Sequence, residues 1–180
     1  MPFTETPLPG CYVFEPRVWG DARGYFYESY NAETFAAAGI HNQFIQDNQA
    51  YSSYGVLRGL HYQRGEHAQA KLVRVLHGEV LDVVVDLRPD SDSYGQSFSI
   101  RLSGDNHKQL FVPRHFAHGY VVLSETALFL YKCDNGYHKA AEGGLHYADP
   151  QLGIDWQIDP EKVVLSEKDR ILPQLGAHLV

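Results

Sequence analysis

Short apolar runs, separated by turn residues, recur along most of the chain. Runs of roughly four to eight apolar or alternating residues, bounded by Gly, Pro, Asn or Asp, are typical of β-strands. The sequence predicts about nine short strands, drawn from the segments 11–14, 25–30, 44–48, 56–61, 70–76, 79–87, 97–102, 109–112, 119–123 and 127–132. The tight turn at His77-Gly78 further predicts that the segments on either side of it pair as a hairpin.

One early helix interrupts these strands. Asn31 is a good N-cap, alanines follow it, and Gly39 is typical of a helix end, so residues 31–39 are predicted to be helical. Further short elements are predicted at 152–156, 163–165 and 167–172. Many strands with so little helix favour a barrel or sandwich over alternating strands and helices. The sequence thus predicts a single domain, residues 1–180, built as an all-β jelly-roll barrel with a few short peripheral helices.

The composition excludes several classes of partner. The net charge is -7 and no basic run appears, which gives nucleic-acid binding no electrostatic support. No apolar run approaches the length that spans a membrane, and the N-terminus lacks the pattern of a secretion signal. Cys11 and Cys133 show no repeated spacing, so we expect free thiols. The sequence therefore predicts a cytoplasmic protein with neither a nucleic-acid nor a membrane partner.

A histidine lies among basic residues in the predicted strands. His61 is flanked by Arg58 on one side and Lys71 on the other. A base among fixed positive charges suits the removal of a proton next to a carbonyl in an anionic substrate. Lys71 would then face the enolate oxygen, and Arg58 would bind a phosphate. A histidine in a strand is more often structural when considered alone, so this hypothesis depends on the rest of the chain.

The charges on segment 70–76 need partners. Lys71 and Arg74 fall on opposite faces of that strand, so one of them must face the interior. A buried charge is costly unless it meets a carboxylate or a ligand. Asp82 is an available carboxylate, and a structural Lys71–Asp82 ion pair is the plainer alternative to a catalytic lysine.

His115 and His118, beside a predicted strand, raise the alternative of a metal site with His61. Metal-binding cupins, which are jelly rolls, carry a His-x-His pattern followed by a Glu at their first motif. Here Gln63 takes the place of the second histidine, with Glu66 after it, and an amide is a poor ligand for a transition metal. The sequence therefore predicts no metal.

Two later residues extend the acid–base chemistry. Tyr131 lies on the predicted strand 127–132, and its phenol, with a reference pKa of about 10, suits the delivery of a proton to an enolate. Asp169 is a candidate to orient His61 and stabilise its charged form. The spacing alone leaves that contact open.

Residues near the N-terminus add groups suited to a nucleotide. Arg23 and Arg58 are fork-shaped donors that match a diphosphate. Glu28, Gln46 and Asn48 offer a carboxylate and amides to a base or sugar edge. Their plainer interpretation is a turn followed by edge strands.

Nine motifs, spread in order from Glu15 to Arg170, carry these residues. They include Asp21-Ala22-Arg23-Gly24, Gln46-Asp47-Asn48, Arg58-Gly59-Leu60-His61-Tyr62-Gln63, Lys71-Leu72-Val73-Arg74-Val75, Phe116-Ala117-His118-Gly119, Phe129-Leu130-Tyr131-Lys132 and Leu165-Ser166-Glu167-Lys168-Asp169. Together they resemble the motifs of the dTDP-4-dehydrorhamnose 3,5-epimerase family. Any one motif is weak evidence, whereas nine in the family's order make coincidence implausible.

The resemblance implies a cupin-type jelly roll that works as a homodimer, with no metal and no organic cofactor. The implied substrate is a dTDP-linked 4-keto-6-deoxyhexose, inverted at C3 and C5. By position, His61 resembles the family's base and Asp169 its partner. Tyr131 resembles the acid on the opposite face of the sugar, and Lys71 the residue that stabilises the enolate.

The resemblance also implies a set of substrate-binding residues. They are Arg23, Phe26, Glu28, Gln46, Asp47, Asn48, Arg58, His118, Tyr137, Glu142 and Lys168, of which Tyr137 matches the ring that stacks on thymine. Three alternatives stay open. They are an epimerase that inverts only C3 or only C5, a non-catalytic cupin that binds a nucleotide sugar, and a metal-dependent cupin enzyme.

Overall fold

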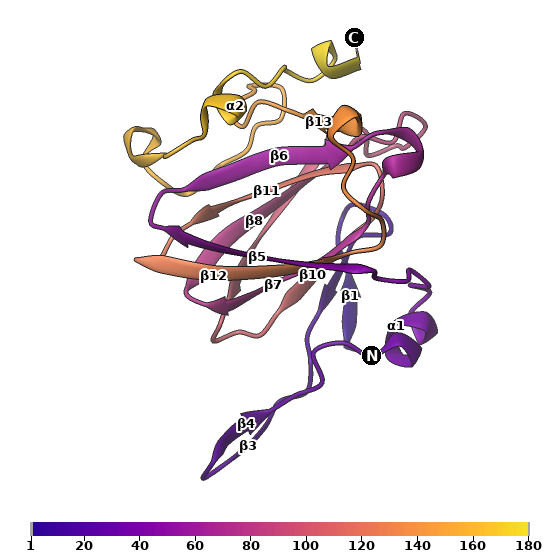
Figure 1. The fold of residues 1–180 in the computed structure, drawn as a ribbon, viewed down its shortest axis with the longest axis vertical. Helices are drawn as coiled ribbons and strands as arrows, with labels where there is room; N and C mark the ends of the chain where they lie inside the picture. The colour runs from indigo at the N-terminus through magenta and orange to yellow at the C-terminus, as the bar shows by residue number, and fades with distance from the viewer. Residues whose placement is uncertain (1, 180) are drawn as a thin grey trace.

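Two large antiparallel sheets form the body of the protein, for which a computed structural model describes residues 2–179. One sheet contains, in spatial order, β1 (Phe3–Glu5), β2 (Tyr12–Phe14), β10 (Gln109–Val112), β7 (Lys71–His77), β12 (Thr126–Cys133) and β5 (Gln46–Ser53). The other contains β13 (Glu142–Gly144), β6 (Leu57–Gln63), β11 (Phe116–Val122), β8 (Glu79–Asp86) and β9 (Ser97–Ser103). A separate hairpin of β3 (Trp19–Asp21) and β4 (Gly24–Phe26) projects from this body (Figure 1).

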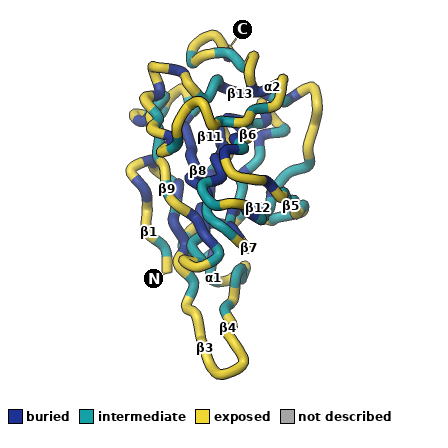
Figure 2. Tube along the Cα trace, turned by 90° about the vertical axis from the view of Figure 1, so that its left-hand side faces the viewer, coloured by how far each residue is buried: buried dark blue, intermediate teal, exposed yellow. Residues whose placement is uncertain are grey.

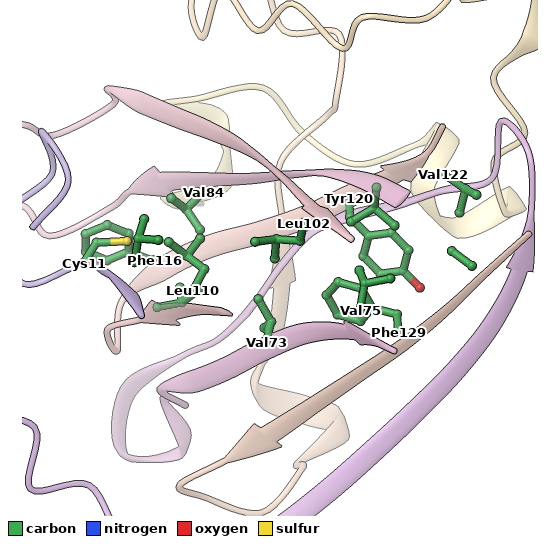
Figure 3. Close-up of a cluster of buried hydrophobic side chains, with 14 of the residues drawn as sticks. Cys11, Val73, Val75, Val84, Leu102, Leu110, Phe116, Tyr120, Val122 and Phe129 are labelled. Carbon is green, nitrogen blue, oxygen red and sulfur yellow. The ribbon is translucent and has the colours of Figure 1, made fainter. Parts of the chain in front are cut away.

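The main apolar core lies between the two facing sheets (Figure 3). On β8, Val80 and Val84 point into this core, whereas Leu81, Val83 and Val85 pack in a second cluster under the C-terminal segments. Both faces of β8 are therefore buried, which explains its continuous apolar run. Two facing antiparallel sheets around one core confirm the predicted jelly roll.

The helices are short and peripheral, as predicted. In α1 (Ala32–Ala37), Asn31 Oδ1 accepts hydrogen bonds from the backbone N–H groups of Glu33 and Thr34. The second helix, α2 (Glu167–Arg170), begins after Ser166, whose hydroxyl accepts from the Asp169 N–H. Single 3₁₀ turns lie at Gly65–His67, Lys139–Ala141, Pro160–Lys162 and Ala177–Leu179. No helix among residues 2–179 is long and apolar enough to cross a membrane.

The predicted hairpin across Gly78 is wrong. β7 pairs with β10 and β12, and β8 pairs with β9 and β11, so the chain passes from one sheet to the other at this turn. Gly78 has a φ of +77°, and a side chain there would collide with the carbonyl oxygen of Thr126. A tight turn in the sequence does not distinguish a hairpin from a crossover between facing sheets.

Several strand boundaries also differ from the prediction. β5 starts at Gln46 and continues to Ser53, and β11 starts at Phe116. Strands β1, β3 and β13 were not predicted. Segments 152–156 and 163–165 contain no strand, although Val164 forms an isolated bridge with Val56.

Candidate active site

A cavity of about 660 Å³ lies between the sheets, with walls from β5, β6, β7, β11, β12 and the segment that leads into α2. The predicted residues that line it are Asn48, Arg58, His61, Lys71, His118, Tyr131, Lys168 and Asp169. An adjoining hollow of about 200 Å³ shares Asn48, His61, Lys71 and Tyr131, and adds Gln46, Tyr137 and Glu142. Most of the predicted site residues therefore meet in one region.

His61 on β6 contacts Asp169 of α2. His61 Nε2 lies 2.6 Å from Asp169 Oδ1, and Asp169 is only 4% exposed. Burial alone would raise the pKa of Asp169, but the hydrogen bond and charge of His61 outweigh burial and lower it. The N-cap bond from Ser166 holds the Asp169 backbone in place. An ionised carboxylate at this distance fixes the orientation of the imidazole ring.

We expect Asp169→Asn to lower the free energy of unfolding at pH 7 by about 1.5–3 kcal/mol, the range for a hydrogen bond to a charged group. A carboxyl with a lowered folded-state pKa stabilises the fold above its unfolded pKa of about 3.9, and this stabilisation is lost as the pH falls through the folded value. Urea unfolding of both proteins at pH 7 and pH 3 measures the effect. If the wild type and Asp169→Asn differed in free energy of unfolding by the same amount at pH 7 and pH 3, Asp169 would not be ionised in the folded protein.

Lys71, Asp82 and His118 form a charged group in the barrel interior. His118 Nε2 lies 2.9 Å from Asp82 Oδ2, and both side chains are buried. Burial raises the pKa of Asp82 against the opposing effects of His118 and Lys71. Burial likewise lowers the pKa of Lys71, and Asp82 opposes that shift.

Within residues 2–179, Asp82 pairs with His118, and no carboxylate oxygen lies within 4.0 Å of Lys71 Nζ. The structural Lys71–Asp82 ion pair is therefore absent. Lys71 lines the cavity and can offer its ammonium group to a ligand.

Tyr131 faces the same cavity from β12, opposite Asn48 on β5 and Val73 on β7. Its ring centroid lies 6.0 Å from Lys71 Nζ. Burial raises the pKa of Tyr131 to about 12. The phenol is therefore protonated at neutral pH and can act as a proton donor.

The adjoining hollow carries polar groups at its mouth. Tyr137, which is 56% exposed, donates a hydrogen bond to Glu142 at 3.1 Å, and Lys168 forms an ion pair with the same carboxylate. Burial alone would raise the pKa of Glu142, but Lys168 lowers it. Gln46 donates to Asn48 at 3.0 Å on the inner face of β5. These groups offer an exposed aromatic ring beside donors and acceptors.

Asp47 does not reach the cavity. Side chains alternate along a strand, so Gln46 and Asn48 face inward while Asp47 faces outward. Asp47 instead pairs with Lys132 Nζ at 3.0 Å. The predicted binding role of the Asp47 side chain is therefore not supported by this geometry.

Arg23, Phe26 and Glu28 do not line the cavity of their own chain either. Arg23 and Phe26 belong to the projecting hairpin, where Arg23 pairs with Asp21. The hairpin is exposed along its length, in contrast to the barrel strands (Figure 2). Within a single chain, Arg23, Phe26 and Glu28 are therefore not placed to contact a substrate in the cavity.

Gln63 has a structural partner. Its side-chain oxygen accepts a hydrogen bond from the His138 N–H at 2.8 Å. Among the residues that the structure describes, no three His, Cys, Asp or Glu side chains are grouped as metal ligands.

Sequence reasoning missed Ser52 and Tyr120. Arg58 Nε donates to Ser52 Oγ at 3.2 Å, and Tyr120 lines the cavity two residues after His118. The alternation of side chains along a strand could have identified both residues. Ser52 lies on the same face of β5 as Asn48, and Tyr120 lies on the same face of β11 as His118.

Comparisons with known proteins identify the family of this chain. The family model described as dTDP-4-dehydrorhamnose 3,5-epimerase matches residues 5–177. The Pseudomonas aeruginosa protein of that name is 50% identical over 171 residues, which cover 94% of this chain and 93% of that protein.

Solved structures show the same similarity in three dimensions. A dTDP-4-dehydrorhamnose 3,5-epimerase of Elizabethkingia anophelis has a TM-score of 0.94 and 52% identity, covering 97% of this chain and 96% of that chain. A dTDP-6-deoxy-D-glucose-3,5-epimerase of Legionella pneumophila, in complex with dTDP-4-keto-L-rhamnose, has a TM-score of 0.93 and 46% identity, covering 99% and 96%. This chain therefore belongs to the dTDP-4-dehydrorhamnose 3,5-epimerase family of isomerases.

Proposed function

We propose that this protein converts dTDP-4-dehydro-6-deoxy-D-glucose to dTDP-4-dehydro-L-rhamnose by inverting C3 and C5. The observation that carries the proposal is the arrangement of one cavity. A histidine–carboxylate pair, a protonated phenol and a lysine amine without a carboxylate partner all line this cavity.

His61 acts as the base in this proposal. C3 and C5 both flank the C4 ketone, so removal of either proton sends the electron pair of the C–H bond to the ketone oxygen and forms an enolate. His61 accepts the proton, and Asp169 stabilises the imidazolium that results. Because the substrate's own ketone accepts the electrons, the reaction requires no cofactor.

Lys71 and Tyr131 complete each inversion. The Lys71 ammonium stabilises the enolate oxygen, an effect often worth about 3 kcal/mol in a site that excludes water. Tyr131 then delivers its proton to the face of the carbon opposite His61. His61 releases its proton and Tyr131 regains one from solvent before the second carbon reacts.

A coupled assay tests the overall conversion. The purified protein is given dTDP-4-dehydro-6-deoxy-D-glucose together with NADPH and the reductase that acts on the doubly inverted sugar. Formation of dTDP-L-rhamnose, identified by chromatography, supports the proposal. An unchanged substrate pool would refute it.

The proposal includes a homodimer in which each β3–β4 hairpin completes the partner's site. Trp19, Tyr25 and Phe26 are exposed on the hairpin, where apolar rings favour contact with another surface. Arg23 lies at its turn, outside its own chain's cavity. Docking the hairpin on a second copy would bury the rings and could bring Arg23 to the diphosphate.

Complementation tests this arrangement. His61→Ala and Arg23→Ala chains, co-expressed with different tags and purified as a heterodimer, should recover about half of the wild-type activity, because one of two sites is then intact. A heterodimer of His61→Ala and Lys71→Ala chains is the control and should stay inactive, since both residues line one chain's cavity. If Arg23 acted within its own chain, the first pair would show no recovery.

We further propose that residues 1–180 form one domain and that the enzyme works in the cytoplasm without nucleic-acid or membrane partners. The two sheets share one core, and Cys11 and Cys133 are buried free thiols, which suits a reducing compartment. The acidic net charge disfavours binding to nucleic acid.

A further inference from the structure

One buried hydroxyl of the cavity has no hydrogen-bond partner. Among residues 2–179, only two buried side-chain polar atoms lack one, Asp82 Oδ1 and the Tyr120 hydroxyl. Buried polar groups are nearly always paired, and an unpaired one destabilises the fold. Asp82 already accepts a bond from His118 with its other oxygen. Tyr120 has a single polar atom, and that atom is unused.

Packing fixes the Tyr120 ring beside the proposed reaction site. The ring stacks on Phe129 with centroids 4.0 Å apart and planes at 12°. Figure 3 shows its oxygen pointing away from Leu102 and Val84, toward the far end of the apolar cluster. Tyr120 lines the same cavity as Tyr131, the proposed acid. The position of the ring is therefore fixed, and its hydroxyl makes no hydrogen bond within the fold.

The groups around this hydroxyl determine which ligand atom suits it. Burial is the first cause that raises the pKa of Tyr120, so its phenol is a neutral donor at physiological pH. Arg58, Ser52 and Asp82 are the polar groups that affect this hydroxyl. Arg58 and Ser52 bond to each other at 3.2 Å, and neither completes a hydrogen bond to Tyr120. Arg58 is exposed and is the natural donor for a charged diphosphate. A neutral, buried phenol instead suits an uncharged ligand oxygen that enters the cavity more deeply than the diphosphate does.

We propose that the Tyr120 hydroxyl donates a hydrogen bond to an oxygen of the hexose, either a hydroxyl or the ring oxygen. Tyr120 is thus a sugar-binding residue that helps to distinguish the nucleotide sugar from the free nucleotide. This inference rests on the proposed function for the identity of its ligand.

Calorimetry with dTDP and dTDP-L-rhamnose tests the proposal, because neither probe needs turnover. Tyr120→Phe keeps the stacked ring and removes only the hydroxyl. We expect the variant to bind dTDP as the wild type does and to bind dTDP-L-rhamnose about 2- to 12-fold more weakly, the range of one neutral hydrogen bond. Its melting temperature should equal or exceed that of the wild type. Tyr147→Phe, in the second apolar cluster, is the matched control and should change neither affinity.

Three results would overturn the proposal. Equal loss of affinity for both probes would place the contact on the nucleotide, and unchanged affinity for both would mean that the hydroxyl binds no ligand. A lower melting temperature with unchanged affinities would show a structural role. If the wild type bound both probes but failed to turn over the keto sugar, the proposed function would fail while the Tyr120 result stayed valid.

Discussion

Replacing His61 with alanine should stop turnover and deuterium uptake together. Without the imidazole, the proposed acceptor of the proton from C3 or C5 is missing, and Tyr131 on the other side of the cavity is a protonated donor. General-base catalysis typically contributes about 10²–10⁴-fold, so the rate should fall at least that far. Binding of dTDP should persist, since the nucleotide contacts are separate from the base.

Two measurements distinguish loss of the base from loss of the fold. Calorimetry with dTDP reports whether the His61→Ala site is intact, and exchange of substrate protons in D₂O reports on the base itself. Asp169→Asn is the graded control, because it keeps the imidazole but removes the negative charge of its 2.6 Å partner, and should reduce the rate less. Ordinary turnover by the His61→Ala protein would eliminate His61 as the base.

Tyr131→Phe should separate proton removal from inversion. The variant keeps His61, so the enolate still forms, but the opposite face of the ring receives no proton. We expect epimerisation to fall by about 10²–10⁴-fold. Exchange at the first carbon should continue with retention of configuration, because His61 can return a deuteron to the face from which it took the proton.

Proton NMR of the recovered sugar nucleotide measures both quantities in one sample. The Tyr147→Phe protein, altered at a residue that does not line the cavity, should show the wild-type rate and product. Normal inversion by Tyr131→Phe would rule out Tyr131 as the acid. Loss of both exchange and inversion would also contradict this role, because Tyr131 would then be needed to form the enolate and not only to protonate it.

Local patterns predicted the parts of the site that lie on regular strands. Tyr131 shares the inner face of β12 with Phe129 and Cys133, as alternation requires. The same rule places Asp47 outside the barrel, although the family motif suggested a binding role. The resemblance identified Gln46-Asp47-Asn48 as a family motif, whereas strand periodicity determined which of its side chains reach the cavity.

Contacts between distant segments could not be predicted from spacing. His61 and Asp169 are 108 positions apart, and α2 has only four residues. Their contact depends on how the C-terminal segments pack on the five-stranded sheet. The prediction of a hairpin at Gly78 was wrong for a related reason. The residues of a tight turn are the same whether the next strand pairs with the preceding one or faces it across the core.

Double epimerisation through an enolate is tested by proton NMR in D₂O of the reaction with dTDP-4-dehydro-6-deoxy-D-glucose, with the product trapped by the reductase and NADPH. We expect one solvent deuteron at C3 and one at C5 of dTDP-L-rhamnose. Deuterium at a single carbon, with only that centre inverted, would contradict double epimerisation and indicate a single-site enzyme. Deuterium at neither carbon would contradict the enolate mechanism and the roles proposed for His61, Lys71 and Tyr131.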